Sequence, residues 1–329
     1  MTTRRKVLQT ATGGIALLAH RFVLSQSNRK VKIVGVLSIT NAQRVGRLVG
    51  AFMQGMRERD WIDGQNIEYR MAFADGDMQR LDQLAAELVE QKVDVIIVGE
   101  GPAARAAQRA TSSIPIVMTA VPNAVGSGLI ASLAKPGGNI TGLTNQYEEA
   151  IAKLVEVLHE AVPAARRLAV LVNESTPAHT AFWTGAQTAC AALGMEALRV
   201  PANVPAQIES AVAEMVAKRA QSVIITGDAM HLSERVRLLE FLRPTRLAVG
   251  GPNQDYAMAG ALLSFGADLA AQLRYVAKYV DKILRGARPA ELPVEQPTRF
   301  ELVLNLKAAK ALGIAFPQSV LLRADEVIR

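Results

Sequence analysis

VDVIIVGEGPAARAAQRA, residues 93–110, places a strand, a tight turn and the start of a helix in one continuous stretch. Apart from Asp94, residues 93–98 form a β-branched apolar run, which is typical of a strand buried in a parallel sheet. Gly99-Glu100-Gly101 then turns the chain, and Pro102 takes the first position of a helix, where proline is favoured. The stretch therefore predicts one strand-to-helix unit of an α/β fold.

The same alternation extends to both sides of this unit. We predict strands over 31–37, 67–73, 93–98, 114–118 and 140–143, with Asp77 capping a helix that ends near Gln91. A second series after Tyr147 has strands over 168–172, 196–200, 222–226, 247–249 and 261–265. Its helices lie over 147–161, 177–193, 204–219, 231–242 and 268–285. The pattern indicates an α/β chain with two Rossmann-like lobes, whose parallel sheets bind ligands beyond the carboxyl ends of their strands.

Composition excludes several classes of protein. The chain has 329 residues, 50% of them apolar and 20% charged, which is typical of globular proteins and allows two domains. Four basic residues near the start, Arg4, Arg5, Lys6 and Arg21, supply four of the seven net positive charges and leave +3 for the rest. No run of lysine and arginine is interleaved with aromatics, so we expect no nucleic-acid binding. Cys190 is the single cysteine and cannot form an internal disulfide.

The first 27 residues resemble an export signal. Arg4-Arg5-Lys6 precedes a short apolar run over 11–19, which is too short to span a bilayer permanently. The paired arginines are typical of a twin-arginine signal, and a general secretory signal is the other interpretation. We predict cleavage near 25–27 and a periplasmic mature protein. An amphipathic N-terminus is the alternative.

The turn at Gly99-Glu100-Gly101 imitates a dinucleotide-binding fingerprint without completing it. Its third glycine is displaced, and 118–121 lacks the acidic residue expected about twenty positions on. We favour a strand-to-helix turn whose free N–H groups hold an anionic group of a ligand.

Nothing in the chain indicates catalysis. The four histidines, His20, His159, His179 and His231, have no metal-ligand spacing and form no recognisable motif with a carboxylate. There is no nucleophile elbow and no phosphate-binding lysine loop. We expect no catalytic residue, no cofactor and no metal, and therefore no enzyme.

Several stretches together resemble the ABC transporter substrate-binding protein family that includes tryptophan/tyrosine-binding proteins. The longest is GSGLIASLAKPGGNITGL at 126–143, preceded by IPIVM at 114–118. Others are GQNI at 64–67, YVDKILRG at 279–286, LPVEQPT at 292–298, FELVLNLK at 300–307 and LLRADEVI at 321–328. The likeness covers nearly all of 31–329.

The resemblance implies a type I periplasmic-binding-protein fold, in which the chain crosses between lobes three times. We place the crossings near Asn145, near 265–267 and near Thr298. One lobe then combines 31–145 with 266–297, and the other combines 146–265 with 298–329. The resemblance also implies a small-molecule solute, and as partners an inner-membrane permease with its ATPase. The chain itself is expected to be a monomer that meets the membrane only through the permease.

Polar residues just beyond strand ends are the predicted solute ligands, because they recur at the same position in the topology. Backbone N–H groups at 99–101 are expected to take an anion, and Asp228 or Asp255 an amine. The predicted set is Ser38, Thr40, Gly99, Glu100, Thr119, Asn123, Asn145, Asn173, Asp228 and Asp255. Two other functions stay open: a periplasmic sensory or regulatory protein of the same fold, and a nucleotide-dependent α/β enzyme.

Overall fold

A computed structural model of the protein describes residues 31–145, 147–176, 178–296 and 300–329. The predicted export signal, the cleavage region and the predicted crossing at Thr298 lie outside these residues. Residues 31–329 form one compact unit by their internal contacts. None of the described helices is both long and apolar enough to span a membrane.

The first sheet has five parallel strands in the order β2-β1-β3-β4-β5. They are β1 (Lys32–Ser38), β2 (Ile67–Phe73), β3 (Val95–Val98), β4 (Ile116–Pro122) and β5 (Ile140–Asn145). The helices between them are α1 (Ala42–Arg57), α2 (Met78–Glu90) and α3 (Gly101–Ala110). All five strands of the first predicted series are confirmed, and β2 has the predicted bounds.

Both faces of the first sheet are buried, which explains its nearly continuous apolar strands. Because side chains alternate along a strand, Ile96 and Val98 pack on the face covered by α2 and α3. Val95 and Ile97 pack on the opposite face against Phe52 of α1. All four residues of β3 are at most 4% exposed.

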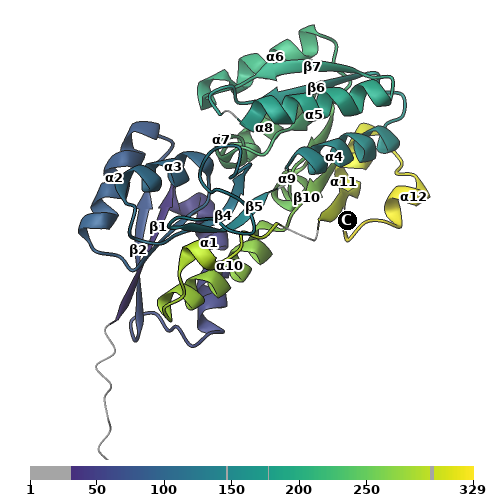
Figure 1. Cartoon of the computed structure of the whole chain (residues 1–329). Helices are drawn as coiled ribbons and strands as arrows, with labels where there is room; N and C mark the ends of the chain where they lie inside the picture. The colour runs from purple at the N-terminus through teal and green to yellow at the C-terminus, as the bar shows by residue number, and fades with distance from the viewer. Residues whose placement is uncertain (1–30, 146, 177, 297–299) are drawn as a thin grey trace, which may run out of the picture. The chain divides into compact units, whose positions relative to one another are not determined.

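A helix from much later in the chain completes this opposite face. α10 (Leu269–Leu284) lies beside α1, as Figure 1 shows, and contributes Val276 and Val280 to the same core. The two helices approach closely at Gly55, where an added Cβ would lie 2.3 Å from the carbonyl oxygen of Arg274. Trp61 Nε1 donates to Asp281 Oδ1 over 2.8 Å in the same region.

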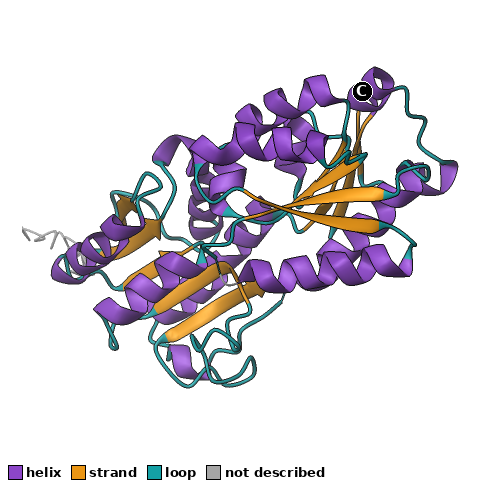
Figure 2. Ribbon diagram, turned by 90° about the horizontal axis from the view of Figure 1, so that it is seen from above, coloured by secondary structure: helices purple, strands orange, loops and turns teal. Residues whose placement is uncertain are grey.

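The second sheet has seven strands in the order β12-β11-β10-β9-β8-β6-β7. Its strands are β6 (Arg167–Val172), β7 (Glu196–Pro201), β8 (Ser222–Ile225), β9 (Ala248–Gly251), β10 (Leu263–Gly266), β11 (Glu301–Asn305) and β12 (Glu326–Ile328). Its helices include α4 (Tyr147–Ala161), α5 (Ala178–Ala192), α6 (Ile208–Ala217), α11 (Leu306–Leu312) and α12 (Gln318–Leu321). Figure 2 shows helices on both faces of the strands.

One strand pair in the second sheet is antiparallel. β10 ends at Gly266 and β11 begins at Glu301, and these two residues are partners in the ladder. Before β11 the chain runs along the first sheet, where the N–H of Glu295 donates to the carbonyl of Gly142 over 3.0 Å. The chain therefore enters β11 at the end where it left β10, and the strand runs the other way.

Two predicted helices differ from the structure. The predicted helix 231–242 is two helices, α7 (Ala229–Ser233) and α8 (Arg235–Leu242), separated at Glu234. The predicted helix 204–219 starts as a 3-10 turn at Pro205–Gln207 before α6 begins. α9 (Gln254–Ala259) has no counterpart among the predicted elements, because six residues are too few for a helical period to stand out. The predicted division into lobes stays a prediction.

Candidate functional site

Predicted residues of the first sheet gather at the carboxyl ends of its strands. Ser38 ends β1, Glu100 follows β3, and Thr119 lies in β4. Ser38 and Thr119 are buried. A Cβ at Gly99 would lie 3.7 Å from Thr119 Oγ1, so glycine leaves the backbone close to that hydroxyl. Parallel topology brings these residues together because all the strands end at the same edge.

Glu100 is the most perturbed acid of this edge. The Ser38 hydroxyl donates to Glu100 Oε1 over 2.7 Å, and lies 3.1 Å from the Thr40 hydroxyl. Glu100 Oε2 is buried and has no hydrogen-bond partner among the residues that the structure describes. Burial raises the pKa of Glu100 to about 7, although the Ser38 hydroxyl and the backbone N–H of Ile39 lower it in part, and the charge of Asp228 raises it further.

Asp228 and Asn173 form a second polar cluster at the carboxyl edge of the second sheet. Asp228 follows β8 and caps α7, where its Oδ1 accepts from the N–H groups of Met230 (2.9 Å) and His231 (3.1 Å). Asn173 follows β6, and its Nδ2 donates to Asp228 Oδ2 over 3.2 Å. The two residues are brought together because β6 and β8 are neighbours in the sheet.

Two buried histidines complete this cluster. The N–H of Asn173 donates to His179 Nδ1 over 2.9 Å, so the imidazole proton is on Nε2, 3.6 Å from Asp228 Oδ2. His231 Nε2 lies 3.0 Å from the carbonyl oxygen of Ala202 and must donate there. Burial lowers the pKa of His231, against the charge of Asp228, which raises it.

The ionised state of Asp228 follows from these contacts. Burial alone would raise the pKa of Asp228, but the contact with His179 and the charges of His231 and His179 outweigh it and hold the pKa below its usual range. The sequence indicates no histidine paired with a carboxylate, and the structure corrects this for His179. The sequence does contain one sign of this cluster. His231 follows Asp228 by three residues, and a capping aspartate accepts from the backbone N–H at that position.

Three predicted residues have other partners. Asn123 is exposed at φ +46°, and its Oδ1 accepts from the N–H of Gly126 over 3.0 Å, so it holds a turn. Asn145 Oδ1 accepts from Gln272 Nε2 over 3.1 Å. Asp255 Oδ1 pairs with the Arg47 guanidinium at 2.7 Å, which joins α9 to α1.

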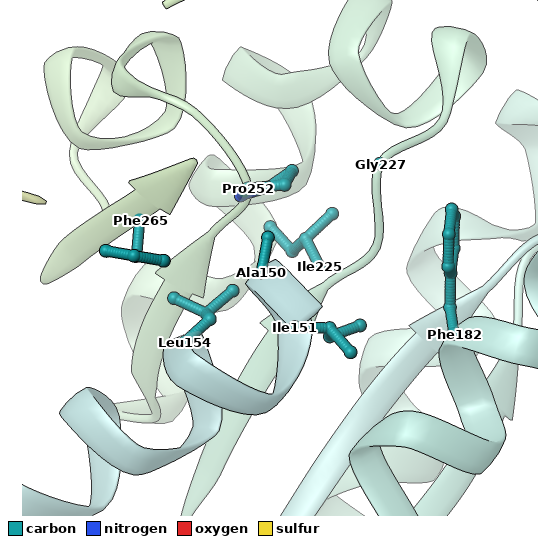
Figure 3. A pocket seen from close by; sticks show the side chains of 8 residues that line it. All are labelled: Ala150, Ile151, Leu154, Phe182, Ile225, Gly227, Pro252 and Phe265. Carbon is teal, nitrogen blue, oxygen red and sulfur yellow. The ribbon is translucent and has the colours of Figure 1, made fainter. Parts of the chain in front are cut away.

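An apolar pocket lies beside the Asp228 cluster (Figure 3). The space in it that a water molecule can occupy is about 10 Å³, room for roughly one water, and the pocket opens to solvent. In Figure 3 the rings of Phe182 and Phe265 stand on opposite sides of the aliphatic residues. Gly227, one residue before Asp228, forms part of the wall. The full lining is Ala150, Ile151, Leu154, Phe182, Ile225, Gly227, Pro252 and Phe265.

The sequence did not reveal this pocket, because its lining comes from four elements and two loops whose apolar residues resemble ordinary core. Phe265 stacks on Phe300, with ring centroids 5.8 Å apart, and Phe182 contacts His179 at 5.0 Å. An apolar lining next to a carboxylate and amide cluster favours an amphipathic small molecule. Its apolar part would need the lining residues to move apart, because the free space is that of about one water. Among the described residues, no group of three histidine, cysteine, aspartate or glutamate side chains is placed to hold a metal ion.

A family model and a relative of known binding both match most of the chain. The model of the family described as "ABC transporter substrate binding protein" matches residues 33–328. A tyrosine-binding protein of Clostridioides difficile (strain R20291) is 25% identical over 288 residues, which cover 87% of this chain and 82% of that protein.

Solved structures have the same fold. A conserved domain protein from Vibrio cholerae O1 biovar El Tor has a TM-score of 0.85 at 28% identity, covering 91% of this chain and 100% of that one. An ABC domain from Streptococcus pneumonia in complex with L-Trp has a TM-score of 0.85 at 23% identity, with the same coverage.

Proposed function

Because the chain belongs to the ABC transporter substrate-binding protein family, whose model matches residues 33–328, we propose that it captures a small amino-acid-like solute for an ABC importer. The observation that carries this proposal is the approach of strand-end carboxyl groups from both sheets, Glu100 and Asp228, whose charges interact beside an apolar pocket. A solute with one apolar and one polar end satisfies both surfaces at once. The family is one of substrate-binding proteins and not of enzymes.

An L-amino acid with an apolar or aromatic side chain has this chemistry. Phe265 is half-buried and lines the pocket together with the buried Phe182. An apolar side chain can pack there, while the polar residues at the strand ends offer hydrogen bonds to its main-chain groups. The names of two similar proteins mention tyrosine and L-Trp, which makes L-tyrosine and L-tryptophan sensible first probes.

The proposed cycle is capture by closure. Solute contacts residues of both sheets only when these are close, so binding stabilises the closed arrangement by the free energy of those additional contacts. A membrane permease with its ATPase then receives the solute. We place the mature chain in the periplasm as a monomer, exported by residues 1–27 through the twin-arginine or the general secretory route.

A solute screen tests the proposal. The protein is screened by thermal unfolding against the twenty L-amino acids, small carboxylates and sugars, and hits are measured by calorimetry. A ligand at 100 times its Kd adds about 2.7 kcal/mol to stability, which raises the Tm by several degrees. One bound solute per chain among the apolar or aromatic amino acids is the expected result. No shift with any amino acid would contradict the proposed class.

A pair of variants tests the pocket. Ala150→Leu adds volume to the pocket wall, and we expect it to lower the affinity roughly tenfold by excluding part of the solute side chain. Ala152→Leu is the control, since it lies two residues further along α4 and outside the pocket lining. Equal affinity in both variants would show that the solute does not use this pocket.

A further inference from the structure

Building on the proposed function, we infer that the solute carries a protonated amine and that Glu100 accepts its N–H at Oε2. The assignment comes from the three carboxylates among the predicted site residues, Glu100, Asp228 and Asp255. They differ in the hydrogen bonds that they already accept. Glu100 is the one with an unused buried oxygen.

One oxygen of Glu100 accepts a hydrogen bond from a hydroxyl, and the backbone N–H of Ile39 lies near enough to the carboxylate to lower its pKa. Oε1 accepts from the Ser38 hydroxyl, while Oε2 is buried without a partner among the described residues. A buried acceptor without a hydrogen bond is unfavourable. A donor from the solute therefore contributes more binding free energy here than at an acid that is already hydrated. A positively charged donor contributes the most binding free energy, because its hydrogen bond to a carboxylate is charge-assisted.

Asp228 and Asp255 are already engaged. Asp228 accepts from two backbone N–H groups and from Asn173 Nδ2, and its Oδ2 faces His179 Nε2 at 3.6 Å. Asp255 is paired with the Arg47 guanidinium. A solute amine at either residue would have to displace an existing donor.

The charges around Glu100 favour a cation over an anion. Asp228 is the charged residue that acts on Glu100, and its negative charge opposes ionisation of Glu100. A cation at Oε2 offsets that repulsion. The Glu100 carboxylate also stands at the start of α3, so an anion approaching the N–H groups of 99–101 would meet a negative charge. We therefore assign this turn to the amine and not to a carboxylate.

Paired ligands test the assignment. Calorimetry compares L-tyrosine with 3-(4-hydroxyphenyl)propionate and L-tryptophan with indole-3-propionate, each pair differing in the amine. For the amino acid that binds, we expect Glu100→Gln to weaken affinity about 100-fold. Its des-amino analogue should already bind weakly to the wild type and change less than about threefold in the variant. Glu90→Gln, an exposed site at the end of α2, is the charge-matched control and should leave both affinities unchanged.

A proton count distinguishes binding from a purely structural role. With a pKa of about 7, Glu100 is about half protonated at pH 7 in the free protein and must ionise to accept an ammonium group. Binding at pH 7 should therefore release about half a proton, which calorimetry in buffers of different ionisation enthalpy measures. Glu100→Gln should release none from this site. Glutamine still accepts from Ser38 through its Oε1, and the unfolding midpoint checks that the variant is folded.

The outcomes separate the two proposals. If the wild type binds none of the twenty L-amino acids, the proposed solute class fails. If the wild type binds an amino acid, but its des-amino analogue binds equally or Glu100→Gln binds it as the wild type does, the assignment to Glu100 is overturned while the solute class stands.

Discussion

The surroundings of Glu100 and Asp228 shift the pKa values of these two carboxyl groups in opposite directions. Asp228 lies among backbone N–H groups, an amide and a histidine, all of which stabilise its charge. Glu100 is partly buried, with its Oε2 fully buried, and the Ser38 hydroxyl and the Ile39 N–H stabilise its charge only in part, while the charge of Asp228 disfavours a second negative charge nearby. Asp228 is therefore ionised across the physiological pH range, while Glu100 titrates within it.

The titration of Glu100 predicts a pH-dependent stability. The folded chain keeps this proton up to about pH 7, whereas the unfolded chain loses it near the ordinary value of 4.5. The folded state binds more protons between these values, so the stability from Glu100 is complete below pH 4.5 and is lost as the pH rises through about 7. Relative to Glu100→Gln, the wild type should lose up to roughly 3 kcal/mol over this interval.

Urea unfolding of both proteins at several pH values between 4.5 and 8 measures this difference. Asp228 and His231 titrate in both proteins, so their contributions cancel in the comparison. Glu90→Gln removes an exposed carboxylate and is the control for the loss of a negative charge as such. A difference between Glu100→Gln and the wild type that is constant with pH would show that Glu100 has an ordinary pKa.

At the scale of elements, the glycines of α1 differ in the space around them. Gly50 has nothing within 4 Å of an added Cβ, whereas at Gly55 the Cβ would lie 2.3 Å from the Arg274 carbonyl oxygen of α10. Gly55 therefore permits the close approach of two helices that are more than 200 residues apart in sequence. The helix tolerates its lower propensity there because packing with α10 compensates.

The same substitution at these two sites should have opposite effects. Gly55→Ala should lower the free energy of unfolding by about 1–3 kcal/mol, because α1 and α10 must move apart. Gly50→Ala should raise it by up to about 1 kcal/mol, because alanine favours the helix. Denaturant unfolding measures both, and a stabilising Gly55→Ala would show that the helices are less tightly packed than described.

At the scale of the whole chain, an ion pair joins elements of the two sheets. Arg47 of α1 pairs with Asp255 of α9, and α9 packs against β9, β10 and β11 of the second sheet. Arg47 is half exposed, so the pair is screened by solvent and salt. A weak contact of this kind suits a structure that opens and closes, as we propose.

If closure brings Arg47 and Asp255 together, removing the pair should weaken solute binding. Arg47→Gln should raise Kd by up to about fivefold at low salt, the equivalent of 1 kcal/mol, and the difference should fade in 1 M salt. Arg70→Gln is the control, because its partner Glu68 lies on the same strand, β2. Calorimetric titration of the bound amino acid at two salt concentrations measures both variants. Equal Kd values for Arg47→Gln and the wild type at low salt would contradict the coupling.

Local patterns in the sequence predicted most helices and strands, but not the helix break at Glu234 or the direction of β11. β2 and α4 have the predicted bounds, and Asp77 caps α2 by accepting from the N–H of Gln79. Apolar periodicity and capping depend on residues only a few positions apart, so both can be recognised in the sequence. The break at Glu234 and the antiparallel β11 depend on where distant segments lie, and no local pattern records that.

The sequence by itself determined the α/β class, the family and the strand-end position of Ser38, Glu100, Asn173 and Asp228, because strand ends follow from hydrophobic periodicity. Only the tertiary structure decided which of these residues meet. It set Asp228 among His179, His231 and Asn173, tied Asn123 into a turn, and left one oxygen of Glu100 without a partner. The physical reason is that burial and hydrogen bonding, which set the charge and capacity of an acid, depend on neighbours in space and not on neighbours in sequence.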